Sequence, residues 1–209
     1  MSDEAAIPTR TAEPHAATGL PCAAEELRTE RLCLRPLNTG ELDEAQSYQR
    51  ARDVVRYLHW EVHDHEESAK RLRKRLAMNG LHQDGDGIVY AVELLDADGG
   101  HTRVIGHMSM FLKSAQWAQV ELGWVFHPAI HGRGYATEAT KRLLQLAFDG
   151  LGAHRVFAQL DARNEASARL CEIVGMHQEA LLREREIKDD RWVDTAIYSL
   201  LEDEFRSAQ

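Results

Sequence analysis

Short runs of apolar or alternating residues recur along the chain from residue 31 onward, and most are bounded by glycine, proline or charged residues. This pattern is typical of β-strands, in which successive side chains point to opposite faces of the sheet. Seven strands are predicted in this way, over residues 31–37, 88–95, 104–112, 120–126, 156–160, 181–187 and 193–200. The glycine-rich turn at 96–100 predicts that the second and third of them form a hairpin.

Four other segments repeat their apolar residues at the spacing of an α-helix. The clearest is Gly134–Gly150, in which alanines and leucines form one broad apolar face. Another begins at Asn164, a residue type that caps helices, and ends at Gly175. Two more are predicted before the hairpin, over residues 40–53 and around residues 69–76. Strands and helices mixed in this order predict one α/β domain built on a single mixed sheet.

Residues 1–26 carry alanine, proline, threonine and glutamate without a clear period, so we expect a flexible tail followed by a domain over residues 27–209. The first residues are acidic and lack the apolar core of a secretory signal. No apolar run approaches the roughly 18 residues of a membrane span. These features favour a cytoplasmic protein without membrane contact.

Charge and cysteine content narrow the classes of function. The chain has 25 lysines and arginines against 34 acidic residues, a formal net charge of -9. This balance disfavours nucleic-acid binding, which depends on cations that neutralise phosphates, and it favours the approach of a cationic acceptor such as an amine. The cysteines, Cys22, Cys33 and Cys171, are odd in number and far apart, which argues against a disulfide framework or a cysteine zinc site.

One segment predicts a binding site from its local structure. It reads HPAIHGRGYATEA from His127 to Ala139 and places a strand end, a glycine-containing loop and the strongest helix in succession. Such a junction directs backbone N–H groups and the positive end of the helix dipole at one point, which suits a phosphate or pyrophosphate. Gly132 and Gly134 allow the anion to approach closely, and Arg133 can add a charge-assisted contact. Neither the Walker A pattern nor the dinucleotide fingerprint is complete.

The loop resembles the acetyl-CoA pyrophosphate loop of the GCN5-related N-acetyltransferases (GNAT). Residues 131–136 match their pattern Gln/Arg-x-x-Gly-x-Gly/Ala, with His131 at the first position. Further blocks resemble the ribosomal-protein-alanine N-acetyltransferase (RimJ/RimL-like) branch: LRTERLCLRP at 27–36, VELGW at 120–124, NEASARLCEIVGM at 164–176 and WVDTAIY at 192–198. The resemblance implies a single GNAT-like α/β (α+β) domain. Its mixed, mostly antiparallel sheet would have about seven strands flanked by about four helices, with the fourth and fifth strands splayed apart.

The resemblance also implies acetyl-CoA as cosubstrate. Its pantetheine would lie between the splayed strands and pair with Trp124, Val125 and Phe126. Asn164 and Ser167 would face the pantetheine and the thioester from the following helix. The residues implied at the pyrophosphate are those of the loop and the helix start, namely His131, Gly132, Arg133, Gly134, Tyr135, Ala136 and Thr137.

The implied reaction is direct attack of a primary amine on the thioester, which needs a base for the ammonium and a proton donor for the leaving thiolate. Glu186 lies on the penultimate strand at a position resembling the base proposed in the branch. Glu121 lies just before the pantetheine-pairing segment, and it stays the competing candidate. Cys171 replaces the tyrosine acid of many relatives, so Ser167, a serine that the branch uses as donor, is the candidate acid.

Tyr57, His59 and Trp60 are expected to line the acceptor pocket, because the corresponding loop does so in the family. His59 and His63 have the spacing of zinc ligands on a helix, but the segment begins a helix and lacks a distant fourth ligand, so no metal is expected. The acceptor stays open between a protein N-terminus and a small amine, and the acyl group between acetyl and another such as succinyl. A non-catalytic CoA-binding module is the alternative, and a homodimer is possible.

Overall fold

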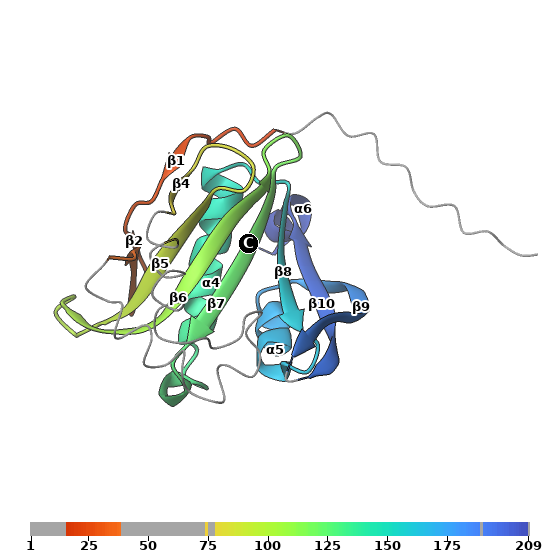
Figure 1. The fold of residues 1–209 in the computed structure, drawn as a ribbon. Coiled ribbons are helices and arrows are strands. Elements are labelled where there is room, and N and C mark those ends of the chain that lie inside the picture. Colours follow the sequence, from red (N-terminus) through yellow and green to blue (C-terminus); the bar gives the residue numbers. More distant parts are fainter. Residues whose placement is uncertain (1–15, 39–73, 75–77, 189, 209) are drawn as a thin grey trace, which may run out of the picture.

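Ten strands form one sheet in the part of the chain that the computed structural model describes, residues 16–38, 74, 78–188 and 190–208 (Figure 1). The seven longer ones confirm the predicted strands: β3 (Leu32–Pro36), β5 (Gly87–Leu95), β6 (His101–Ser114), β7 (Gln119–Phe126), β8 (Arg155–Asp161), β9 (His177–Lys188) and β10 (Arg191–Leu201). The sequence does not predict the three short strands β1 (Cys22–Ala23), β2 (Leu27–Arg28) and β4 (Asn79–Leu81). Two or three residues are too few to show a period.

The strand order is β1-β4-β5-β6-β7-β8-β10-β9. β3 also pairs with β5, on the same edge as β4, and β2 pairs with β3. Within the described residues every pairing is antiparallel except that of β7 with β8. Parallel neighbours need a long crossover, and here the chain between them forms a helix. The predicted hairpin is the β5–β6 pair.

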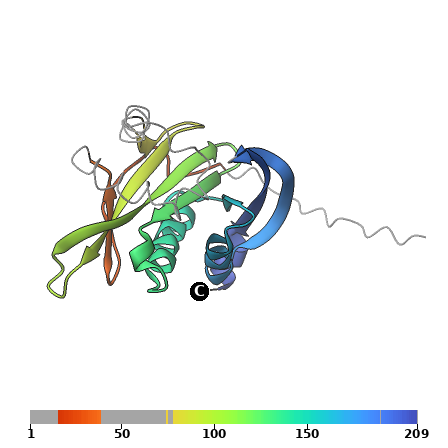
Figure 2. The same ribbon diagram turned by 60° about the horizontal axis from the view of Figure 1, so that its bottom comes forward.

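Two predicted helices are confirmed, and both lie beneath the curved sheet in Figure 2. The first, α4 (Tyr135–Gln145), starts at Gly134 and continues as a π-helical turn over Leu146–Gly150. The second, α5 (Glu165–Ile173), starts at the predicted cap Asn164, whose side chain accepts a hydrogen bond from the Ser167 N–H. The buried face of α4 packs into the same apolar core as the inner faces of β5 to β8.

A further short helix, α6 (Glu202–Ser207), follows β10 and was not expected from the sequence. Its Phe205 ring stacks on Phe148 with ring centroids 4.6 Å apart. The predicted helices over 40–53 and around 69–76 lie outside the described residues, apart from residue 74. Among the residues that are described, no helix combines the length and apolar character needed to cross a membrane.

Part of the segment predicted as a tail packs on the domain. The Ala17 N–H donates to the Ala115 carbonyl at 3.0 Å, and the Gly19 N–H donates to the Leu151 carbonyl at 3.2 Å. Leu20 packs against the core, and β1 pairs with β4. The packed domain therefore begins well before the predicted boundary at residue 27. The sequence pattern missed this because irregular backbone hydrogen bonds leave no periodicity.

Candidate active site

β7 and β8 pair over three residues only, from Gln119↔Arg155 to Glu121↔Phe157. Beyond this point β7 stays hydrogen-bonded to β6, β8 stays hydrogen-bonded to β10, and the two strands diverge toward the lower part of Figure 1. They are the fourth and fifth of the predicted strands, so the predicted splay is confirmed. Within the described part of the chain, residues 122–126 of β7 have no strand partner on the side of β8. A free strand edge of this kind can pair with an extended amide-containing ligand.

A hydrogen bond between side chains crosses the divergence near its open end. The Trp124 Nε1 donates to the Ser167 Oγ at 3.1 Å, joining β7 to the first turn of α5. An indole N–H can only donate, so the serine oxygen is the acceptor and its own O–H is left to donate to a third group. Asn164 fixes the same turn through the Ser167 N–H, at 3.1 Å. Three residues predicted to face the cosubstrate are thus brought together from two elements.

Glu121 lies where β7 and β8 are still paired. Its carboxylate forms an ion pair with the Lys113 ammonium at 3.0 Å and accepts a hydrogen bond from the Gln159 amide at 3.2 Å. One carboxylate oxygen is thus held by a cation from β6 and the other by an amide from β8. The contacts give Glu121 a role in joining the strands β6, β7 and β8.

Glu186 lies on β9 in a group of charged residues at the C-terminal end of β8. Asp161 is 1% exposed, accepts a hydrogen bond from the Arg163 Nη2 at 2.7 Å, and lies 3.7 Å from the Lys188 ammonium. Burial lowers the pKa of Lys188, and the negative charges of Asp161 and Glu186 partly offset that effect. The half-buried Glu186 therefore lies in the field of a buried cation, near the turn that leads into α5.

An irregularity in β9 precedes Glu186. The pairing of β9 with β10 shifts between Val193 and Thr195, and Glu184 takes a left-handed backbone conformation with φ of 51°. The Asp194 carboxylate accepts a hydrogen bond from the Glu184 N–H at 2.8 Å and so supports this conformation. Bulges of this kind bend a strand and redirect the side chains beside them, and they are frequent next to active sites.

The predicted anion-binding loop joins β7 to α4. A 3-10 turn over Pro128–Ile130 leads to Gly132 and Gly134, whose φ angles of 75° and 80° lie in the left-handed region that favours glycine. Gly134 is the N-cap of the eleven-residue α4 and provides no side-chain hydrogen bond to its first turn. The first turn of α4 therefore receives no hydrogen bond from an N-cap side chain, and an anion at this helix start stays a prediction.

Arg31 supports this loop, although it is not among the predicted site residues. Its Nη1 donates to the Arg133 carbonyl at 3.2 Å, and its Nε and Nη2 lie 2.7 and 2.6 Å from the Glu138 carboxylate. The guanidinium also lies over the Tyr135 ring, 4.7 Å from its centroid. Burial raises the pKa of Glu138, but hydrogen bonds from Thr29 and Arg31 outweigh that effect and lower it overall. Glu138 is therefore charged at neutral pH and holds Arg31 against the loop.

The loop residues His131 to Thr137, together with Trp124, Val125 and Phe126, border the divergence of β7 from β8. Tyr57, His59 and Trp60, predicted at the acceptor pocket, lie outside the described residues. The described site thus combines a helix start without a side-chain cap, a free strand edge and the Ser167 hydroxyl.

This arrangement suits a ligand that joins a phosphate group to an extended chain containing amides. The family model described as the acetyltransferase (GNAT) domain matches residues 31–177 of the chain. The chain belongs to the GNAT family.

Known proteins similar to this chain agree with that assignment. The uncharacterized N-acetyltransferase YnaD of Bacillus subtilis (strain 168) is 27% identical over 179 residues, covering 86% of this chain and 98% of YnaD. A probable GNAT acetyltransferase of Chromobacterium violaceum ATCC 12472, known from its crystal structure, is 25% identical with a TM-score of 0.74, covering 96% of this chain and 100% of that one. Together these findings make the protein an N-acetyltransferase of the GNAT type.

The spermidine N-acetyltransferase of Vibrio cholerae, solved in complex with CoA and spermine, has a TM-score of 0.70 and 21% identity. The match covers 85% of this chain and 99% of that one. At this identity the likeness shows the fold alone.

Proposed function

We propose that the protein transfers an acetyl group from acetyl-CoA to a primary amine. The observation that carries the proposal is the placement of the Gly132–Gly134 loop, at the start of α4, beside the edge of β7 that β8 leaves free. A pyrophosphate on the helix start would direct the attached pantetheine along residues 124–126. The thioester would then lie near Ser167, which Trp124 holds from the other side.

The chemistry follows from these positions. Glu186 takes a proton from the substrate ammonium, and the free amine attacks the thioester carbonyl carbon. Backbone N–H groups on the open edge of β7 stabilise the negative charge that develops on the carbonyl oxygen. The new C–N bond forms as the C–S bond breaks, and the leaving thiolate takes a proton from the Ser167 hydroxyl.

Two features support this distribution of roles. The contacts of Glu121 with Lys113 and Gln159 support a structural role for that carboxylate, and Glu186 lies at the position that resembles the base of the RimJ/RimL-like branch. Cys171 is fully buried, and burial raises the pKa of its thiol to about 12. A protonated, inaccessible thiol cannot serve as a nucleophile, so direct attack is favoured over an acyl-enzyme.

We infer that the acceptor is cationic, since the net charge of -9 attracts amines. The blocks at 27–36 and 164–176 support placement in the RimJ/RimL-like branch, in which the acceptor would be a protein N-terminus. A small polyamine is the alternative acceptor, since a spermidine N-acetyltransferase has the same fold, and the test includes it.

The test is release of free thiol from acetyl-CoA and succinyl-CoA with N-terminal peptides, polyamines, amino sugars and amino acids, with CoA binding measured in parallel. We expect release from acetyl-CoA with one class of amine. Release from succinyl-CoA alone would reassign the acyl donor, and binding without release on any acceptor would indicate a non-catalytic CoA-binding module.

Trp124→Phe is expected to lower kcat about tenfold while CoA affinity is retained, because one hydrogen bond that orients Ser167 is lost. The measurement is steady-state thiol release together with calorimetric CoA binding. Trp117→Phe is the matched control, since Trp117 is 55% exposed and lies in the turn between β6 and β7. An unchanged kcat would show that the bond to Ser167 has no part in the reaction.

Arg31→Ala is expected to weaken CoA binding about tenfold, because the Arg133 carbonyl and Glu138 lose the cation that holds the loop. Calorimetric titration with CoA measures the change. Arg206→Ala removes a comparable arginine–glutamate pair, with Glu202 at 2.7 Å, from the remote helix α6. Equal affinity in both variants would contradict a supporting role for Arg31.

A further inference from the structure

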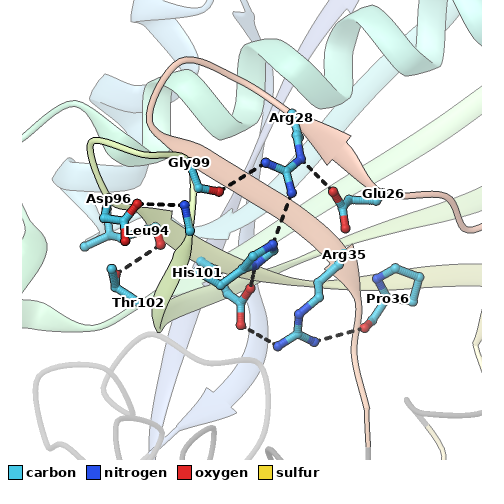
Figure 3. A network of polar contacts seen from close by, with 11 residues as sticks. Glu26, Arg28, Arg35, Pro36, Leu94, Asp96, Gly99, His101 and Thr102 are labelled. Carbon is cyan, nitrogen blue, oxygen red and sulfur yellow. Dashed lines mark hydrogen bonds and ion pairs between the residues drawn. The ribbon is translucent and has the colours of Figure 1, made fainter.

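A second group of side chains lies where β2 and β3 meet the β5–β6 hairpin, and Figure 3 shows two of its members, Glu26 and His101. Glu26, Cys33 and His101 each offer one atom that can bind a metal, and these three atoms lie within 4.8 Å of one another. Cys33 is wholly buried, whereas Glu26 and His101 are exposed. Such a site is anchored on its inner side and open to solvent on its outer side.

The hydrogen bonds of His101 determine which ring nitrogen is free to bind a cation. Its Nε2 lies 3.2 Å from the Arg28 Nη2, and a guanidinium can only donate, so Nε2 carries a lone pair. The proton is therefore on Nδ1, which contacts the Glu93 carboxylate. Glu93 is buried and is itself held by Arg35 at 2.5 Å. A carboxylate behind the ring orients a metal-binding histidine and fixes its tautomer.

A cation already lies among these groups. The Arg28 side chain donates from Nε to Glu26 at 2.7 Å, from Nη1 to the Gly99 carbonyl at 3.3 Å and from Nη2 to His101 (Figure 3). Two of the three potential metal ligands, Glu26 and His101, therefore already bind a cationic group, the Arg28 guanidinium. The Arg28 side chain is 50% exposed, so it can turn outward into solvent when another cation takes its place.

We propose that Glu26, Cys33 and His101 form a binding site for a divalent transition-metal ion. Sulfur, nitrogen and oxygen ligands in this combination suit zinc, and the exposed side leaves the fourth position to water. Arg28 leaves the site when the ion binds, and the Cys33 thiol proton is released. The ion joins residues 26, 33 and 101, and so ties the N-terminal strands to the hairpin.

Cobalt(II) is the probe, because thiolate coordination gives it a sulfur-to-metal charge-transfer absorption in the near ultraviolet. Titration of the full chain is expected to produce this absorption with one equivalent of cobalt, and zinc is expected to abolish it by displacement. Cys33→Ser should lose the absorption, whereas Cys22→Ser, which alters a cysteine outside the cluster, should keep it. Glu26→Gln and His101→Gln alter exposed side chains, and each should weaken cobalt binding about tenfold or more.

Arg28→Ala distinguishes a metal site from a purely structural network of polar contacts. Removing the competing cation should strengthen cobalt binding if the site is real. If the network is only structural, Arg28→Ala will lower stability and no variant will bind cobalt. Absence of the absorption from the unmodified protein, or its persistence in Cys33→Ser, would overturn the proposal. These readouts are spectroscopic and independent of acetyl transfer.

Discussion

Gly134→Val is expected to weaken CoA binding on the order of a hundredfold. Gly134 has φ of 80°, a conformation that costs a β-branched residue about 1–2 kcal/mol. A Cβ at this position would meet its nearest atom, the Arg31 Nη2, at 3.5 Å, which is an ordinary contact. The effect therefore comes from the backbone: relaxation to a negative φ turns the N–H groups at the start of α4 away from the anion. Calorimetric titration with CoA measures the loss.

Gly85→Val is the matched control for this substitution. Gly85 has φ of 91°, and a Cβ there would meet nothing within 4 Å. The backbone cost is similar, but the turn before β5 is separate from the CoA loop. Both variants should lose similar stability in urea unfolding, and only Gly134→Val should lose CoA affinity. Normal CoA binding by Gly134→Val would show that the pyrophosphate does not bind to this loop.

Glu186→Gln is expected to lower kcat by about 10²–10³-fold with CoA affinity unchanged, because glutamine keeps the size of the side chain but cannot accept the proton. The deficit should be greatest well below the pKa of the acceptor, where nearly all of the amine is protonated. It should shrink as pH rises and free amine becomes available without a base. Thiol release measured across this pH range tests both statements.

Two variants make the assignment of the base specific. Glu184→Gln changes an exposed carboxylate on the same strand and should leave the pH–rate profile unchanged. Glu121→Gln removes the partner of Lys113 and Gln159 and should act mainly on stability. If kcat instead falls at low pH in Glu121→Gln and is unchanged in Glu186→Gln, Glu121 is the base.

The sequence by itself determined most of the elements that build the site. Strand periodicity located all seven longer strands, the cap Asn164 located the start of α5, and the apolar period from Gly134 located α4. Gly132 and Gly134 were predicted to let an anion approach closely, and both take a left-handed backbone conformation in the structure. These features are readable because caps, turns and periods depend on neighbouring residues. The splay of β7 from β8 came from the family resemblance, since no local pattern encodes it.

Only the tertiary structure decided which distant side chains meet. Arg31 and Glu138 are 107 positions apart, and Trp124 and Ser167 are 43 apart, yet both pairs are in contact at the site. Cysteine spacing argued against a zinc site, but strand pairing brings Cys33 close to Glu26 and His101. Such contacts depend on strand order and register, which are set by the packing of the whole core rather than by any local pattern. For the same physical reason the bonds that restrain Glu121 became visible only in the folded chain.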